Sequence, residues 1–142
     1  MVIWKRRNTG TKTLKKMKIT NIKHCLNKST IDNKIGVKIS HLTGDETISV
    51  FAIELEKEQS IPVHYHKENI ETYFVLEGQG IVYTGKIENE EVIWNTEKQV
   101  KTGDCFTIYP NQVHGFKNNS EKKLQIIASA PISHNKQDRY FI

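Results

Sequence analysis

The stretch Pro62-Val63-His64-Tyr65-His66 contains two histidines that are separated by one residue. Apolar and β-branched side chains around them indicate a β-strand over residues 61–66. Because positions i and i+2 of a strand point to the same face, His64 and His66 project together into the space which that face encloses. Two adjacent imidazoles are suited to bind a metal ion.

A carboxylate and a third imidazole come from other expected strands. Residues 71–76 are predicted to form a strand with Glu71 and Tyr73 on one face, and a short connection can fold Glu71 back toward the two histidines. His114 follows the turn residues Pro110-Asn111 and begins another strand-like stretch. A carboxylate and three imidazoles are therefore available for one site.

Most of the chain after residue 36 has the pattern of short strands separated by turns. The other strand-like stretches are residues 37–42, 47–55, 80–83, 91–95, 105–109, 113–117 and 124–130. Only residues 11–31 have a weakly helical pattern. Many short strands at a spacing of about 8 to 12 residues predict an all-β sandwich or barrel.

The positions of these residues resemble the two sequence motifs of the cupin superfamily. The first motif, G-x5-H-x-H-x3/4-E-x6-G, is matched by His64, His66, Glu71 and Gly78. The second, G-x5-P-x-G-x2-H-x3-N, aligns without gaps to Gly103, Tyr109, Asn111, His114 and Asn118. The chain departs from the motifs at three positions, with Glu58 and Asn111 in place of glycine and Tyr109 in place of proline. Since asparagine tolerates a left-handed backbone, we expect the turn at Asn111 to form.

The resemblance covers roughly residues 36–132 and implies a double-stranded β-helix, which is a jelly-roll β-barrel. It also implies one divalent transition metal, bound inside the barrel by His64, His66, Glu71 and His114. Three imidazoles and a carboxylate suit Fe, Mn, Zn, Ni or Cu, and these ligand types do not select among the five metals. Glu71 is either a direct ligand or a residue that orients a ligating histidine.

Three residues near these ligands are predicted to line a substrate pocket. Tyr73 shares a strand face with Glu71, and these two are the candidate catalytic residues. Gln112 and Phe116 lie two positions on either side of His114 and share its face. Packing of Tyr73 with a satisfied hydroxyl is the alternative role for that residue.

The strand expected at residues 71–76 has large side chains on both faces. Phe74 and Leu76 point away from the face that carries Glu71, so they need cover from other strands, the N-terminal segment or a second subunit. Homodimers are common among cupins. The two-sided strand and the resemblance together predict a homodimer.

The formal net charge of +5 is concentrated near the N-terminus. Nine of the 21 lysines and arginines lie within residues 1–31, which are expected to form a basic, partly helical extension. Residues 32–142 carry 12 basic and 16 acidic side chains and are expected to form the single barrel domain. A basic nucleic-acid-binding face on that domain is therefore not expected. Met17 is an alternative start of the compact domain.

The chain has no sign of membrane insertion or secretion. No apolar run approaches the roughly 18 to 20 residues of a membrane-spanning helix, and the opening residues MVIWKRR lack the apolar region of a secretory signal. Cys25 and Cys105 have no CxxC spacing, which predicts free thiols in a reducing compartment. We therefore expect a cytoplasmic protein.

The resemblance favours a metal-dependent enzyme that acts on a small molecule. It implies an isomerase, a lyase or a dioxygenase whose substrate is a sugar, a sugar phosphate or a small oxygenated acid. A non-catalytic small-ligand-binding or sensory cupin is the alternative. A third hypothesis is that residues 1–16 contact nucleic acid or an anionic membrane. No G-x-S-x-G motif occurs, which argues against a nucleophilic hydrolase.

Overall fold

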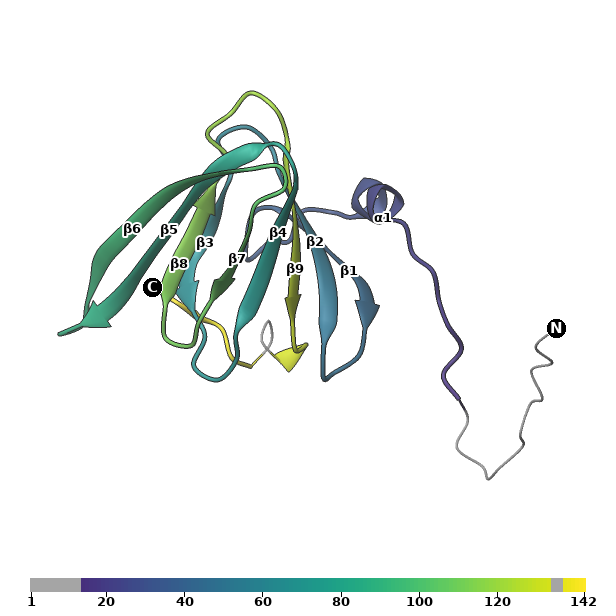
Figure 1. Ribbon diagram of the computed structural model, residues 1–142, viewed down its shortest axis with the longest axis horizontal. Helices are drawn as coiled ribbons and strands as arrows, with labels where there is room; N and C mark the ends of the chain where they lie inside the picture. The colour runs from purple at the N-terminus through teal and green to yellow at the C-terminus, as the bar shows by residue number, and fades with distance from the viewer. Residues whose placement is uncertain (1–13, 134–136) are drawn as a thin grey trace.

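The computed structural model describes residues 14–133 and 137–142. In these residues one short helix precedes ten strands, which form two antiparallel sheets of five strands each (Figure 1). The elements in chain order are α1 (Ile22–Lys28), β1 (Lys38–Gly44), β2 (Ser49–Leu55), β3 (Ser60–Tyr65), β4 (Glu71–Glu77), β5 (Gln79–Glu88), β6 (Glu91–Lys101), β7 (Cys105–Ile108), β8 (Val113–Lys117), β9 (Leu124–Ala130) and β10 (Tyr140–Phe141).

The two sheets are the layers of a barrel. The first sheet has the strand order β1-β2-β9-β4-β7, and the second has the order β10-β3-β8-β5-β6. Strands that are distant in sequence are neighbours, such as β2 with β9 and β3 with β8. This arrangement is a double-stranded β-helix, so the all-β jelly-roll prediction is confirmed. Within residues 14–133 and 137–142, no helix has the length and apolar character needed to cross a bilayer.

All nine strands expected from the sequence are present, but two are longer than predicted and a tenth was not predicted. β5 and β6 extend well beyond residues 80–83 and 91–95 because they pair as a long hairpin whose tip is polar. Asn89 and Glu90 connect them with φ of 50° and 66°, values that fit a two-residue type I′ turn. β10 is only two residues long, which is too short for side-chain periodicity to indicate a strand.

The space between the sheets is filled by apolar side chains from both. Exposure alternates along β9 and along the first half of β4, as expected for strands with one face in the core. Core side chains include Ile53, Leu55, Val75, Val82, Phe116, Leu124 and Ile126. Burial of each such side chain contributes about 1.5 to 3 kcal/mol.

The helix covers part of the outer face of the first sheet. The side chain of Asn21 caps the N-terminus of α1, and Leu26 is buried against Ala52 of β2. In Figure 1, α1 lies near β1 and β2 and leaves the β4 side of this sheet uncovered. The domain boundary expected between residues 31 and 32 stays a prediction, and residues 1–13 of the expected extension lie outside the described residues.

The glycine positions of the two motifs are turns with a left-handed backbone. Gly78 and Gly103 have φ of 90° and 93°, and Asn111 has φ of 65°. The structure therefore forms the turn expected at Asn111 without glycine. Glu58 occupies the position of the first motif's leading glycine and also has a positive φ of 63°, a region that glutamate rarely adopts. The fold keeps the left-handed turn at both positions where a motif glycine is replaced.

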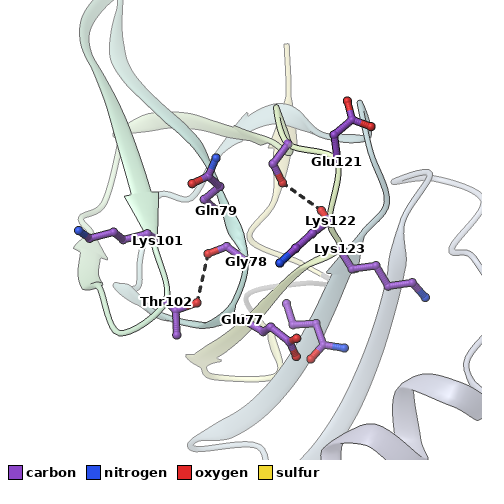
Figure 2. Close-up of a pocket in the computed structure, with 10 residues that line it drawn as sticks. Glu77, Gly78, Gln79, Lys101, Thr102, Glu121, Lys122 and Lys123 are labelled. Atoms are coloured by element: carbon purple, nitrogen blue, oxygen red, sulfur yellow. Dashed lines mark hydrogen bonds between the residues drawn. The ribbon is translucent and has the colours of Figure 1, made fainter.

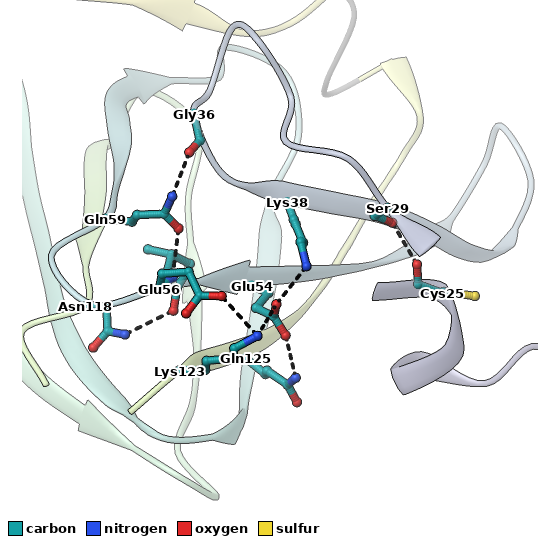
Figure 3. Close-up of polar contacts among 11 residues, drawn as sticks. Cys25, Ser29, Gly36, Lys38, Glu54, Glu56, Gln59, Asn118, Lys123 and Gln125 are labelled. Carbon is teal, nitrogen blue, oxygen red and sulfur yellow. Dashed lines mark hydrogen bonds and ion pairs between the residues drawn. The ribbon is translucent and has the colours of Figure 1, made fainter. Parts of the chain in front are cut away.

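Asn118, the last residue of the second motif, joins two segments, and Figure 3 shows its contact with the end of β2. It is fully buried. Its amide nitrogen donates hydrogen bonds to the carbonyl oxygens of Leu55 at 3.0 Å and Lys122 at 2.7 Å. Its amide oxygen accepts the Ser120 backbone N–H at 2.9 Å. The side chain thus joins the end of β2 to the loop between β8 and β9.

A buried carboxylate on β2 is held by a second polar network (Figure 3). Glu54 is 5% exposed and accepts hydrogen bonds from Lys38 at 3.3 Å, Lys123 at 3.2 Å and Gln125 at 2.8 Å. Burial acts to raise the pKa of Glu54, but the hydrogen bonds from Gln125 and Lys123 hold it below its ordinary value. This network links β1, β2 and β9 on the outer face of the first sheet.

Candidate metal centre

Three strands bring the four predicted ligands to one point inside the barrel. His64 lies in β3, His66 directly follows that strand, Glu71 opens β4, and His114 lies in β8. The pairing of β3 with β8 places His64 opposite His114. The potential ligand atoms of all four residues lie within 4.8 Å of one another, and each of these residues is at most 5% exposed. The sequence pattern therefore corresponds to a compact, buried cluster.

Backbone carbonyl groups fix the orientation of the three imidazoles. Nδ1 of each ring faces one carbonyl oxygen, which belongs to Pro62 for His64 at 2.7 Å, to Gln112 for His114 at 2.9 Å, and to Asp138 for His66. Because a carbonyl oxygen can only accept, each Nδ1 carries a proton, and in the neutral form of each ring the lone pair therefore lies on Nε2. In histidines that bind metals, the ring nitrogen that does not bind the metal typically donates such a hydrogen bond.

The cluster fits a divalent metal ion. Nε2 of His114 is buried and has no hydrogen-bond partner among the described residues, which is costly for a polar atom unless it binds a ligand. Atoms that lie about 2.0 to 2.2 Å from a common ion are at most about 4.4 Å apart. The distances between the four ligand atoms, which are at most 4.8 Å, therefore need only small side-chain movements for all four to bind one ion.

Burial also keeps a ligand in the required protonation state. The pKa of His64 is lowered to about 3, first by burial and then by the neighbouring imidazole of His114. The ring is thus neutral at pH 7 and able to bind a metal through its lone pair.

Glu71 lies against two of the histidines and near a tyrosine. Its Oε2 is 3.4 Å from Nε2 of His66 and 3.8 Å from Nε2 of His114. Tyr73, the next inward residue of β4, is 2% exposed. Burial raises the pKa of the Tyr73 hydroxyl well above its ordinary value, and the charge of Glu71 and a hydrogen bond to it act in the same direction. The phenol is therefore protonated at neutral pH.

The residues predicted to line the substrate pocket lie in two different places. Tyr73 and Phe116 are buried and pack on each other and on Phe106, with ring centroids 4.9 to 5.6 Å apart. Gln112 lines a cavity of about 440 Å³ bounded by β5, β6 and β7, and its side chain accepts the Tyr109 backbone N–H at 2.8 Å. The contact of these residues with a substrate stays a prediction.

The C-terminal segment brings to this site two residues that the sequence analysis did not identify. Asp138 is buried, and its carboxylate accepts the backbone N–H groups of Lys67 at 2.7 Å and Glu68 at 3.0 Å. This holds the loop that directly follows His66. Arg139 is partly buried beside it. A weak indication was present in the sequence, because Arg139 is the only arginine after residue 7, whereas 17 lysines lie in that part of the chain.

Another depression lies at the opposite end of the barrel (Figure 2). It has a volume of about 880 Å³, and Gln79, Lys101 and Lys122 contribute to its lining. Part of its wall is closed by a hydrogen bond from the Thr102 hydroxyl to the Gly78 carbonyl oxygen at 3.3 Å. None of the four candidate ligands lines it, so the metal centre is separate from this depression.

The model of the cupin domain family matches residues 51–129, which is more than half of the chain and includes all four candidate ligands. The chain belongs to the cupin family. The resemblance seen in the sequence motifs is therefore confirmed. No curated protein sequence matches this cupin.

Solved structures with the same fold include the following three bacterial proteins. An uncharacterized conserved protein with a double-stranded β-helix domain from Klebsiella pneumoniae has a TM-score of 0.66 and 20% identity, over 89% of this cupin and 97% of that chain. The capsular polysaccharide assembling protein CapF from Staphylococcus aureus has a TM-score of 0.65 and 17% identity, over 80% of this cupin and 33% of that chain. A predicted oxalate decarboxylase from Thermotoga maritima has a TM-score of 0.53 and 21% identity, over 66% of this cupin and 77% of that chain.

These low identities establish a shared fold only. This cupin also spans about a third of the CapF chain.

Proposed function

We propose that this cupin is a metal-dependent enzyme that acts on a small molecule by isomerisation, lyase chemistry or oxygenation. The observation that carries the proposal is the buried convergence of three oriented imidazoles with the Glu71 carboxylate. His64, His66, Glu71 and His114 would hold one divalent transition metal. Such a metal, when bound, acts as a Lewis acid on a carbonyl or enediolate, or activates dioxygen if it is iron.

The chain's own residues hold these ligands in place. The carbonyl groups that accept from each Nδ1 direct the three Nε2 lone pairs toward one point. We assign Glu71 as the fourth ligand, and we assign Tyr73 as a hydrogen-bond donor to its carboxylate, because the buried phenol keeps its proton. In this role Tyr73 holds a proton and orients Glu71. Phe106 and Phe116 pack beside Tyr73 and close the inner side of the site.

The substrate classes that we propose are a sugar, a sugar phosphate or a small oxygenated acid. One structural neighbour is described as a predicted oxalate decarboxylase, and oxalate belongs to the last class. The burial of the ligands, each of which is at most 5% exposed, supports a small substrate.

Turnover by metal-loaded protein tests the proposal. The protein would be reconstituted separately with Fe(II), Mn(II), Ni(II), Cu(II) and Zn(II) and incubated with a panel from the three substrate classes, with and without dioxygen. We expect turnover by the wild type and none by a His114→Ala variant. Tight binding of a panel compound without turnover under any metal would contradict the proposal and favour the alternative, a non-catalytic ligand-binding cupin.

We also propose that the protein is a homodimer. Phe74 and Leu76 of β4 remain 51% and 41% exposed, and neither belongs to the apolar cluster that packs around α1. A second copy of the chain would bury these side chains. Sedimentation of a dimer at micromolar concentration, and of a monomer for Phe74→Asp, is the expected result, and a monomeric wild type would contradict it.

The two cysteines support a reducing location, for which we propose the cytoplasm. Cys25 and Cys105 are both free thiols, and Cys105 is exposed. Free, exposed thiols persist where glutathione and thioredoxin keep them reduced.

A further inference from the structure

We infer that Arg139 binds the anionic group, a carboxylate or a phosphate, of the small molecule that occupies the metal centre. The inference rests on the proposed function, because it narrows the substrate class of the same site. Its starting point is the path of the C-terminal segment, which crosses the end of the barrel where β3 ends and β4 begins (Figure 1).

The last strand fixes Arg139 beside the ligands. β10 pairs with β3, so that Phe141 lies opposite His64 and the two rings are 5.8 Å apart. The guanidinium carbon of Arg139 lies 5.2 Å from the centroid of the Phe141 ring, a cation–π contact that limits the motion of the cation. The guanidinium is therefore held next to a residue that contacts the metal cluster.

The residue before Arg139 is anchored at the same place. The Asp138 carbonyl oxygen accepts from Nδ1 of His66, and the Asp138 carboxylate accepts from the loop that follows His66. One short segment thus orients a candidate metal ligand and, one residue later, presents a cation.

Arg139 lines a cavity that is large enough for a small acid. The cavity has a volume of about 600 Å³, and its other walls include Asp32, Lys34, Ile39, His41 and Phe51. Ligand pockets in proteins commonly range from about 300 to 1,000 Å³. None of the four candidate ligands lines this cavity. Arg139 links it to the metal cluster, because the guanidinium packs on the Phe141 ring, which lies 5.8 Å from the ring of His64.

The guanidinium is available to an external anion. Within residues 14–133 and 137–142, no carboxylate forms an ion pair with Arg139. The carboxylate of Asp32, which shares the cavity, instead accepts the backbone N–H groups of Lys34 at 2.8 Å and Ile35 at 3.1 Å. A guanidinium presents a planar set of donors that matches the oxygens of a carboxylate or a phosphate.

Calorimetric titration tests the inference with malonate and with inorganic phosphate as probes. Malonamide, which has the shape of malonate without its charge, is the ligand control. Metal-reconstituted and metal-free protein would be titrated at constant ionic strength, with metal content measured for every variant. Whichever probe the wild type binds more tightly identifies the source of the anionic group.

We expect Arg139→Gln to weaken binding of the preferred anion by about tenfold or more, with malonamide binding, metal content and thermal stability unchanged. Arg139→Lys, which keeps the charge but loses the planar donors, should weaken it several-fold. Lys86→Gln removes an exposed lysine of β5 that does not line the cavity, and we expect less than a twofold change. Equal affinity of wild type and Arg139→Gln, or no preference of the wild type for malonate or phosphate over malonamide, would overturn the inference.

Comparing metal-reconstituted with metal-free protein distinguishes this inference from the proposed function. If the protein holds no metal after reconstitution but binds the anion in a way that depends on Arg139, the anion site is supported and the metal centre is contradicted. If the protein holds metal but its affinity for the anion does not depend on Arg139, the metal centre is supported and the anion site is contradicted.

Discussion

Replacing Asn118 by alanine tests whether this motif residue stabilises the fold or serves the metal centre. Its amide makes hydrogen bonds to Leu55, Lys122 and Ser120, and the side chain is fully buried. The Lys122 carbonyl oxygen keeps a second donor, the Ser120 hydroxyl at 3.1 Å. The variant therefore leaves the Leu55 carbonyl oxygen and the Ser120 N–H to find other partners.

An unpaired buried group costs about 1 to 3 kcal/mol, and the Ser120 N–H can recover part of its loss from water because its residue is only partly buried. We expect Asn118→Ala to lower the free energy of unfolding by about 3 kcal/mol, which for a domain of this size corresponds to a fall in Tm of roughly 10 °C. Urea and thermal unfolding of metal-free protein would measure it.

Asn119→Ala is the matched control. This neighbour is exposed and shares only long hydrogen bonds of 3.3 and 3.4 Å with Gln99, so we expect a change within about 0.5 kcal/mol. Both variants should bind the same amount of metal as the wild type. Equal stability of the two variants, or a loss of metal from folded Asn118→Ala, would refute the structural role.

Three further predictions concern the turns and the buried carboxylate. Glu58→Gly should raise the free energy of unfolding by up to about 1 kcal/mol, because glycine adopts the left-handed backbone without strain and the lost ion pair with Lys117 is exposed. Glu58→Ala keeps the strain and should not raise the free energy of unfolding. A gain in both variants would contradict the strain explanation. Gly78→Ala should lower the Tm more than Gly103→Ala does. The two glycines have nearly the same φ, 90° and 93°, but a Cβ at Gly78 would lie 2.3 Å from the Lys123 carbonyl oxygen, and a Cβ at Gly103 would meet no atom within 4 Å. An equal fall in Tm for the two variants would rule out this contact as the cause. The lowered pKa of Glu54 gives stability that is present above its unfolded pKa of about 4.3 and is lost as the pH falls toward the folded pKa. The stability difference between wild type and Glu54→Gln should therefore shrink between pH 6 and pH 3.5 in urea unfolding, and a constant difference would argue against that coupling.

The part of the site that sequence predicts follows from local strand geometry. His64 and His66 share a face because they are two residues apart, and a short connection brings Glu71 back toward them. His114 reaches them through the long-range pairing of β3 with β8, so only the resemblance to the cupin motifs predicted it as a ligand of the same site. The turn at Asn111 was also predictable, since its left-handed backbone suits asparagine. The left-handed backbone at Glu58 was not predictable, because nothing in the side chain favours it and the surrounding fold imposes it.

The contributions of the C-terminal segment depend on contacts between distant residues. Asp138 and His66 are 72 positions apart, and β10 is too short to produce a recognisable strand pattern. Arg139 lies outside both motifs, so only its scarcity in a lysine-rich chain distinguishes it. The role of Asn118 is predictable as a motif position, but the groups that it joins are known only from the folded chain.

The central claim is that the four-residue cluster binds a transition metal. The most direct test is elemental analysis of anaerobically purified protein beside a His64→Ala/His66→Ala double variant, with the exposed pair His24→Ala/His41→Ala as a matched control. We predict about one transition-metal ion per chain in the wild type and in the control, and none in the cluster variant. Equal metal content in the wild type and the cluster variant, including none in either after reconstitution, would contradict the account.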